Sequence, residues 1–157
     1  MNQIHSKRLR KDLDNMLNNP PSNIQIQDIT DMRNWKITLY GAKGTLYEGE
    51  KYTLSFSFGS SYPIEPPEVM FVGEAPVHPH VSGPDAVVVR VFNGHICLSI
   101  LAEGWSPALT VESVCVSILS MLSSCDRKIP PPDNWQYVRR ARPSPKGSKW
   151  DFHDDKV

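Results

Sequence analysis

The first stretch of the chain, residues 3–17, carries apolar residues at intervals of three and four, which is the spacing of one face of an α-helix. That face consists of Leu9, Leu13, Met16 and Leu17. The basic residues of the stretch lie mostly on the opposite side and include Lys7, Arg8 and Lys11. The Pro-Pro pair that follows ends the helix, since proline lacks the amide hydrogen that an α-helix needs. We expect an amphipathic helix whose basic side is either solvated or a docking face for an acidic partner.

From residue 24 to residue 72 the pattern changes to the alternation of period two that is typical of strands. Strands are expected at residues 24–29, 35–40, 51–58 and 68–72. The connections between them are rich in turn-forming residues and no helical segment intervenes, which favours a four-stranded antiparallel meander. The alternation leaves one face of this sheet apolar, so we expect helices to cover it.

A second helix is predicted at residues 110–124, where apolar residues recur at helical spacing and Thr110 is placed to cap the N-terminus. Cys115 lies on the apolar stripe of this helix and is therefore expected to be an inert core residue. Together these elements predict a single α+β domain over residues 1–138, with an irregular C-terminal region. Residues 139–157 form a basic tail that is too polar to build a core, and we expect it to be mobile.

Composition and charge limit the classes of function. The chain has 157 residues, of which 39% are apolar and 22% charged, with 17 basic residues against 17 acidic ones. The zero net charge gives no indication of a nucleic-acid or membrane partner. No apolar run approaches the roughly 20 residues of a membrane span, and the first residues lack the apolar stretch of a signal peptide. Three cysteines without regular spacing fit reduced thiols, which predicts a cytoplasmic or nuclear protein.

The candidate chemistry gathers around Cys97, which follows the tripeptide His78-Pro79-His80 and stands two positions after His95. A zinc site would need about four ligands, and the His and Cys spacing here matches no common zinc pattern. A cysteine hydrolase needs a histidine near its thiol, and His95 is available for that role. A third possibility is a cysteine that accepts an acyl group as a thioester and passes it to an amine. The residue types alone leave the choice open.

Several fragments in order make the third possibility specific: KRLRKDL (7–13), GTLYEGE (44–50), YPIEPPEVMF (62–71), NGHICLSIL (93–101) and WSPALTVESVCVSILSML (105–122). This series resembles the ubiquitin-conjugating enzyme family. The resemblance implies the ubiquitin-conjugating fold, in which an N-terminal helix, the meander, an active-site loop and a central helix are combined. By the same resemblance, Cys97 carries ubiquitin as a glycyl thioester, with His80 and Asn93 as further catalytic residues. The active-site loop would include His78, Pro79 and His95. No bound cofactor and no metal are implied, because the upstream activating enzyme is the one that uses ATP.

Three departures narrow the type within the family. His80 stands where members usually have asparagine, and Ser99 stands where many have aspartate. The segment after the central helix reads SSCDRKIPPPDN in place of the family's usual acidic, DPNPDDP-like one. Together with the C-terminal sequences KW and HDD, these features resemble the W type, whose members attach ubiquitin to the α-amino group of a substrate's N-terminus. An α-amine has a pKa of about 7.7–8.0, against about 10.4 for lysine, so more of it is neutral near pH 7. An enzyme that serves α-amines therefore needs less help from acidic residues in deprotonating its acceptor.

The resemblance also implies partners, namely ubiquitin, an activating enzyme, ring-type ligases and protein substrates with accessible N-termini. The residues expected to meet the activating enzyme are Lys7, Arg8 and Lys11. The residues expected to meet a ring-type ligase are Arg8, Ile64, Pro107 and Ala108. Transfer is expected to yield mono-ubiquitin, with or without a ligase.

Two alternatives remain beside this hypothesis: a lysine-directed conjugating enzyme, and a catalytically silent binding variant of the fold. The inactive variant is favoured by His80 and by the number of residues between His80 and Cys97, which is larger than is usual in the family. The intact NGHIC sequence argues against it. The extra residues within 82–92 are interpreted either as a hairpin arm that shapes substrate access or as an artefact of gene-model splicing.

Overall fold

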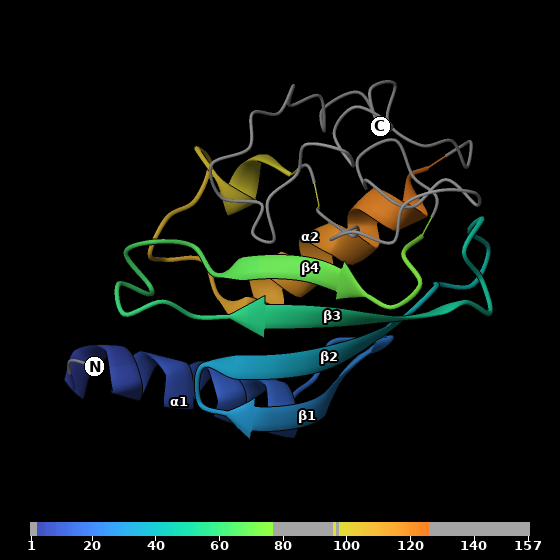
Figure 1. The fold of residues 1–157 in the computed structure, drawn as a ribbon. Coiled ribbons are helices and arrows are strands. Elements are labelled where there is room, and N and C mark those ends of the chain that lie inside the picture. The colour runs from blue at the N-terminus through green and yellow to red at the C-terminus, as the bar shows by residue number, and fades with distance from the viewer. Residues whose placement is uncertain (1–2, 77–95, 97, 126–157) are drawn as a thin grey trace.

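The computed structural model describes residues 3–76, 96 and 98–125 of the chain, with side chains described from residue 6 onward. The elements in chain order are α1 (Gln3–Asn18), β1 (Ile24–Asp31), β2 (Asn34–Tyr40), β3 (Lys51–Ser57), β4 (Glu68–Val72), the 3-10 helix η1 (Ser99–Leu101) and α2 (Val111–Ser123). Figure 1 shows the strands as one sheet, with α2 behind β3 and β4 and α1 alongside β1 and β2. The predicted α+β fold is confirmed. The expected active-site loop and the boundary at residue 138 lie outside the described residues.

The sheet is the predicted antiparallel meander, with strand order β1-β2-β3-β4. Ile37 on β2 lies opposite Ile26 on β1 and opposite Leu54 on β3, and Leu54 lies opposite Phe71 on β4. Residues that lie directly opposite one another in a sheet share a face, so this register gathers the apolar side chains on one side. β1 extends two residues beyond the predicted strand, and β3 ends one residue earlier.

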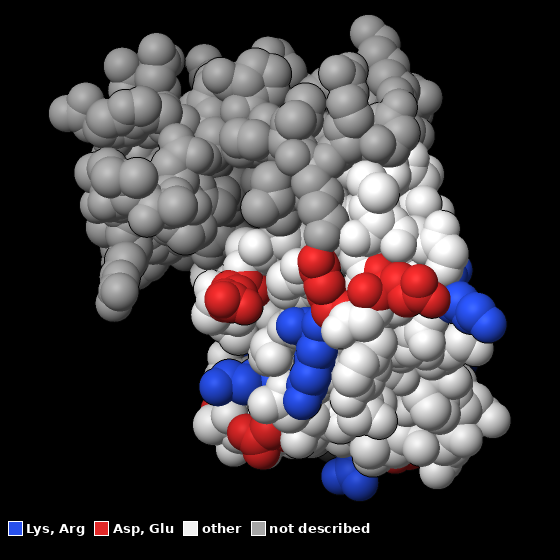
Figure 2. All heavy atoms as spheres, turned by 90° about the vertical axis from the view of Figure 1, so that its right-hand side faces the viewer, with Lys and Arg blue, Asp and Glu red and all other residues white. Residues whose placement is uncertain are grey.

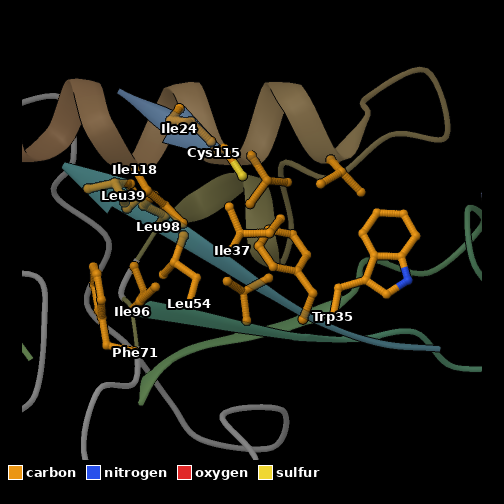
Figure 3. Close-up of a cluster of buried hydrophobic side chains, with 14 of the residues drawn as sticks. Ile24, Trp35, Ile37, Leu39, Leu54, Phe71, Ile96, Leu98, Cys115 and Ile118 are labelled. Carbon is orange, nitrogen blue, oxygen red and sulfur yellow. The ribbon is translucent and has the colours of Figure 1, made fainter. Parts of the chain in front are cut away.

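Helix α2 covers the apolar face of the sheet, as the sequence pattern predicted. Its buried residues are Val111, Val114, Cys115, Ile118, Met121 and Leu122. Figure 3 shows Cys115 and Ile118 reaching from this helix toward Ile37 and Leu39 on β2. The predicted cap is confirmed, because the Thr110 side chain accepts a hydrogen bond from the amide of Ser113, and the Ser113 side chain accepts one from the amide of Thr110.

The buried stripe of α1 differs from the prediction at one position. Leu9 and Met16 are buried and Leu13 packs against the core, but Leu17 is 56% exposed. Each residue advances about 100° around a helix, so Leu17 points away from the core although its neighbour Met16 points into it. Asp12 is only 4% exposed, and this carboxylate lies inside the protein at a position the apolar pattern did not single out.

Candidate active site and partner surface

Cys97 and its predicted companions lie outside the described residues, and their roles stay predictions. These companions are His78, Pro79, His80, Asn93 and His95, together with the extra residues within 82–92. Ile96 and Leu98, the neighbours of Cys97 in the chain, are both buried. Figure 3 shows them on the side of the core near Phe71. The core therefore holds the chain immediately before and immediately after position 97.

The other two cysteines of the chain, Cys115 and Cys125, are buried in the core. Burial raises the pKa of the Cys115 thiol, so this group stays protonated near neutral pH. Cys125 lies at the end of α2, where the Tyr47 hydroxyl is 3.5 Å from its sulfur. A thiol that attacks a thioester must be within reach of its partner, and both of these side chains are buried. Both are core residues, as predicted for Cys115.

The segment after Leu98 closes into a compact turn. The amide of Gly104 donates to the carbonyl oxygen of Ser99 at 2.8 Å, and a Cβ atom at position 104 would lie only 3.1 Å from that oxygen. Trp105 follows, and its indole Nε1 donates to the carbonyl oxygen of Pro63 at 2.8 Å. The chain downstream of position 97 is thus tied to the loop that connects β3 and β4.

The predicted partner-binding residues, Arg8 apart, are accessible on the surface. Lys7 and Lys11 are exposed on α1. Ile64 is 66% exposed, although it is apolar, and Pro107 and Ala108 are exposed on the turn that precedes α2. The sequence-based interpretation of Ile64 as an exposed residue between prolines is confirmed, while its contact with a ligase stays a prediction.

Arg8 differs from the other predicted contact residues, because its guanidinium group binds the protein's own chain. Nη1 donates to the carbonyl oxygen of Pro107 at 2.6 Å, and Nη2 donates to the carbonyl oxygen of Leu109. Nε donates to Oδ1 of Asp12 at 3.2 Å in an ion pair along the helix. The side chain therefore joins α1 to the turn before α2.

Two residues that sequence analysis missed complete this cluster. Asp12 also accepts a hydrogen bond from the hydroxyl of Tyr62, and the guanidinium of Arg8 lies 5.6 Å from the centre of the Tyr62 ring. Burial and the bond to Asp12 raise the pKa of Tyr62, so its hydroxyl remains a donor. The spacing of Arg8 and Asp12, four residues along a helix, was the available signal. Nothing in the sequence pattern pointed to Tyr62.

Charge offers no dominant feature on the face that Figure 2 presents, where acidic and basic side chains are interspersed. Among the described residues, no three His, Cys, Asp or Glu side chains lie together in a way that could hold a metal ion. The histidines and cysteine considered for zinc are outside that set. Within the described part of the chain, no helix is long and apolar enough to cross a membrane.

Comparison with known proteins decides the family. The sequence model described as "Ubiquitin-conjugating enzyme" matches residues 8–146, a span that contains the Cys97 segment, the Tyr62–Ile64 loop and the turn before α2. This chain belongs to the ubiquitin-conjugating enzyme family. As a member it is a ubiquitin transferase, and enzymes of this family work with ubiquitin, an activating enzyme and ligases.

Relatives within the family support the W type. The chain is 52% identical over 153 residues to the "Probable ubiquitin-conjugating enzyme E2 W-A" of Danio rerio, which covers 95% of each chain. It is 48% identical over 158 residues to the "Probable ubiquitin-conjugating enzyme E2 W" of Dictyostelium discoideum, which covers both chains completely. The resemblance to the W type that the sequence suggested is thereby confirmed.

Solved structures of ubiquitin-conjugating enzymes share the fold of this conjugating enzyme. The enzyme UbcA1 from Agrocybe aegerita superimposes with a TM-score of 0.82 at 43% identity, covering 91% of this chain and 99% of the other. An enzyme from Plasmodium falciparum gives a TM-score of 0.68 at 36% identity, with 78% and 86% covered. The expected fold class is confirmed by these similarities as well as by the order of elements.

Proposed function

We propose that this conjugating enzyme accepts ubiquitin as a thioester on Cys97 and transfers it to the N-terminal α-amino group of a protein substrate. The observation that carries the assignment of Cys97 is the burial of the other two thiols. Cys115 and Cys125 are core residues, and the family match spans Cys97 between two buried neighbours. A side chain that must meet the activating enzyme, ubiquitin and an acceptor in turn needs access that the core denies.

The two chemical steps follow from thiol chemistry. The Cys97 thiolate attacks the thioester carbonyl carbon of ubiquitin's C-terminal glycine on the activating enzyme; a new C–S bond forms and the activating enzyme's thiolate leaves. The neutral acceptor amine then attacks the same carbon, the C–N bond forms and the C–S bond breaks. The Cys97 thiolate leaves, and the proton lost by the amine passes to solvent. His80 and Asn93 are proposed to donate hydrogen bonds to the oxyanion of the tetrahedral intermediate. ATP is used only by the activating enzyme.

The choice of acceptor rests on the pKa values of amines. Near pH 7 about a tenth or more of an α-amine is neutral, against less than about a thousandth of a lysine amine. The segment after α2 reads SSCDRKIPPPDN (123–134), with Asp126 and Asp133 in place of the denser acidic run that would assist a lysine. The relatives named E2 W support the same type. We propose mono-ubiquitin as the product, with or without a ring-type ligase, in the cytoplasm or nucleus.

A comparison of two acceptors tests this proposal. A model substrate with a free N-terminus and internal lysines is offered to the charged enzyme, beside the same substrate acetylated at its N-terminus. We expect modification of the free substrate alone. Equal modification of both would establish the lysine-directed alternative, and a chain that never forms a thioester would establish the silent variant.

A further inference from the structure

Three segments that are distant in the sequence meet at one polar cluster beside the predicted ligase surface. They are α1, the loop that carries Tyr62 to Ile64, and the turn that carries Pro107 to Leu109. The segments are connected by hydrogen bonds that involve two side chains of α1. Arg8 reaches the turn through the carbonyl oxygens of Pro107 and Leu109, and Asp12 reaches the loop through the hydroxyl of Tyr62. Because Arg8 and Asp12 also pair with each other, both connections belong to one network.

A further bond joins the loop directly to the turn. Trp105, which stands just before the turn, donates from its indole nitrogen to the carbonyl oxygen of Pro63 at 2.8 Å. The ring of Trp105 lies 6.0 Å from that of Tyr62, centre to centre. The loop and the turn are therefore bonded to each other as well as to α1, and the exposed residues of both lie on one connected surface.

The accessible side chains of this surface include Ile64 from the loop and Pro107 and Ala108 from the turn. Arg8 and Asp12 lie beneath them. The Asp12 side chain is 3% exposed, and the Arg8 side chain is 19% exposed with its guanidinium bound to two carbonyl oxygens. Each of the three guanidinium nitrogens already donates within the chain, which leaves fewer of the five N–H donors for a partner.

We propose that Arg8 and Asp12 are positioning residues, which hold the Ile64 loop and the Pro107–Ala108 turn in the relative placement that a ring-type ligase recognises. This rests on the proposed docking of ring-type ligases to this surface. In this arrangement Arg8 acts through the turn and the ligase touches Ile64, Pro107 and Ala108. Arginine is required because its planar fork serves two carbonyl oxygens and a carboxylate at once, which the single ammonium of lysine does not reproduce.

The first test is made on the free protein and needs no ligase. The amide of Leu109 is bonded to the carbonyl oxygen of Ser106 at 2.9 Å, and that of Ile64 to the carbonyl oxygen of Ser61 at 2.7 Å. We expect Arg8→Lys to speed hydrogen exchange at both amides by about tenfold, because the openings of turns are controlled by their local anchors. Arg10→Lys is the matched control: the same substitution at an exposed site on the same helix, with exchange expected to stay at the original rate.

The second test uses protein that already carries ubiquitin on Cys97, so that loading is not part of the measurement. Release of ubiquitin to a free amine is followed with increasing amounts of an isolated ring domain that stimulates the unsubstituted enzyme. For Arg8→Lys we expect about tenfold more ring domain to be needed for half-maximal stimulation, with the maximal rate largely recovered at saturation. Asp12→Asn, which keeps the shape of the side chain, is a second variant expected to change both measurements in the same direction.

The outcomes separate the possible errors. Unchanged exchange in Arg8→Lys would overturn the positioning role, and weaker stimulation without faster exchange would make Arg8 a direct ligase contact instead. Faster exchange with unaltered stimulation would overturn the link between this network and ligase docking. If ring domains stimulate Arg8→Lys less but acetylated substrates are still modified, the positioning proposal stands while the proposed acceptor fails.

Discussion

Removal of one hydroxyl group, by Tyr62→Phe, tests how much the cluster of Arg8, Asp12 and Tyr62 contributes to the free energy of unfolding. Tyr62 is 1% exposed and its hydroxyl donates to the buried carboxylate of Asp12. Phenylalanine preserves the ring, which packs 4.8 Å from the ring of Phe58 and 6.0 Å from that of Trp105, measured between centres. The substitution therefore removes a hydrogen bond to a charged acceptor and little else.

The expected cost follows from the burial of the acceptor. A hydrogen bond to a charged group contributes about 1.5–3 kcal/mol. The upper part of that range applies because Oδ2 of Asp12 is left buried without its donor, while Oδ1 keeps Arg8. We expect the free energy of unfolding to fall by about 2–3 kcal/mol. For a chain of this size, about 2–4 °C of melting temperature accompanies each kcal/mol, so the melting temperature should fall by roughly 4–12 °C.

Urea denaturation at pH 7 measures this difference, provided that the slope of unfolding free energy against urea is the same in both proteins. Tyr40→Phe is the matched control, because the hydroxyl of Tyr40 lies at the surface and accepts from Gln25 at 3.3 Å. That control should change stability by less than about 0.5 kcal/mol. A loss in Tyr62→Phe no larger than in Tyr40→Phe would refute the claim that the buried hydroxyl stabilises Asp12.

Three further predictions concern the cysteines, the cap of α2 and the pH dependence of the Tyr62 contribution. A maleimide at pH 8 should modify Cys97 rapidly and Cys115 only on unfolding, because burial shields the Cys115 thiol and raises its pKa. Peptide mass spectrometry measures the two rates, and faster modification of Cys115 than of Cys97 would contradict this prediction. Thr110→Ala should cost about 1 kcal/mol in urea denaturation while Thr110→Ser costs less, because serine keeps the oxygen that accepts from the Ser113 amide; equal losses would argue against the cap. Burial and the bond to Asp12 raise the folded-state pKa of Tyr62, so its contribution should be complete below about pH 10 and decline as pH rises further, when the unfolded phenol ionises. Unfolding free energies from pH 8 to 11 should fall less steeply in Tyr62→Phe than in the original protein.

The helices and strands could be predicted because the spacing of apolar residues within each of them matches the face that is buried. Helix α2 is apolar at every position that faces the sheet, and Thr110 stands at the one place where a cap is needed. The alternation in β3 likewise matches the buried positions Leu54 and Phe56. Leu17 shows the limit of this approach, because an apolar residue next to the buried stripe is not thereby part of it.

The cluster around Arg8 could not be predicted, because its partners are far away in the sequence. Arg8 binds carbonyl oxygens 99 and 101 positions further along the chain. Lys7, Arg8 and Lys11 look alike in a helical pattern, and only tertiary packing decides which of them turns toward the protein. Every residue has a main-chain carbonyl oxygen, so the residue types at positions 107 and 109 do not indicate that these oxygens accept from Arg8. The resemblance to the family named the surface but not the side chains that hold it in place.

The central claim, that Cys97 carries ubiquitin, has a direct test. The chain is incubated with activating enzyme, ATP and ubiquitin, and the products are separated with and without a thiol reductant. We predict a single adduct of one ubiquitin that the reductant removes, that Cys97→Ala abolishes, and that Cys125→Ala retains. An adduct that persists in Cys97→Ala, or the absence of any reductant-sensitive adduct in the unsubstituted protein, would contradict the account.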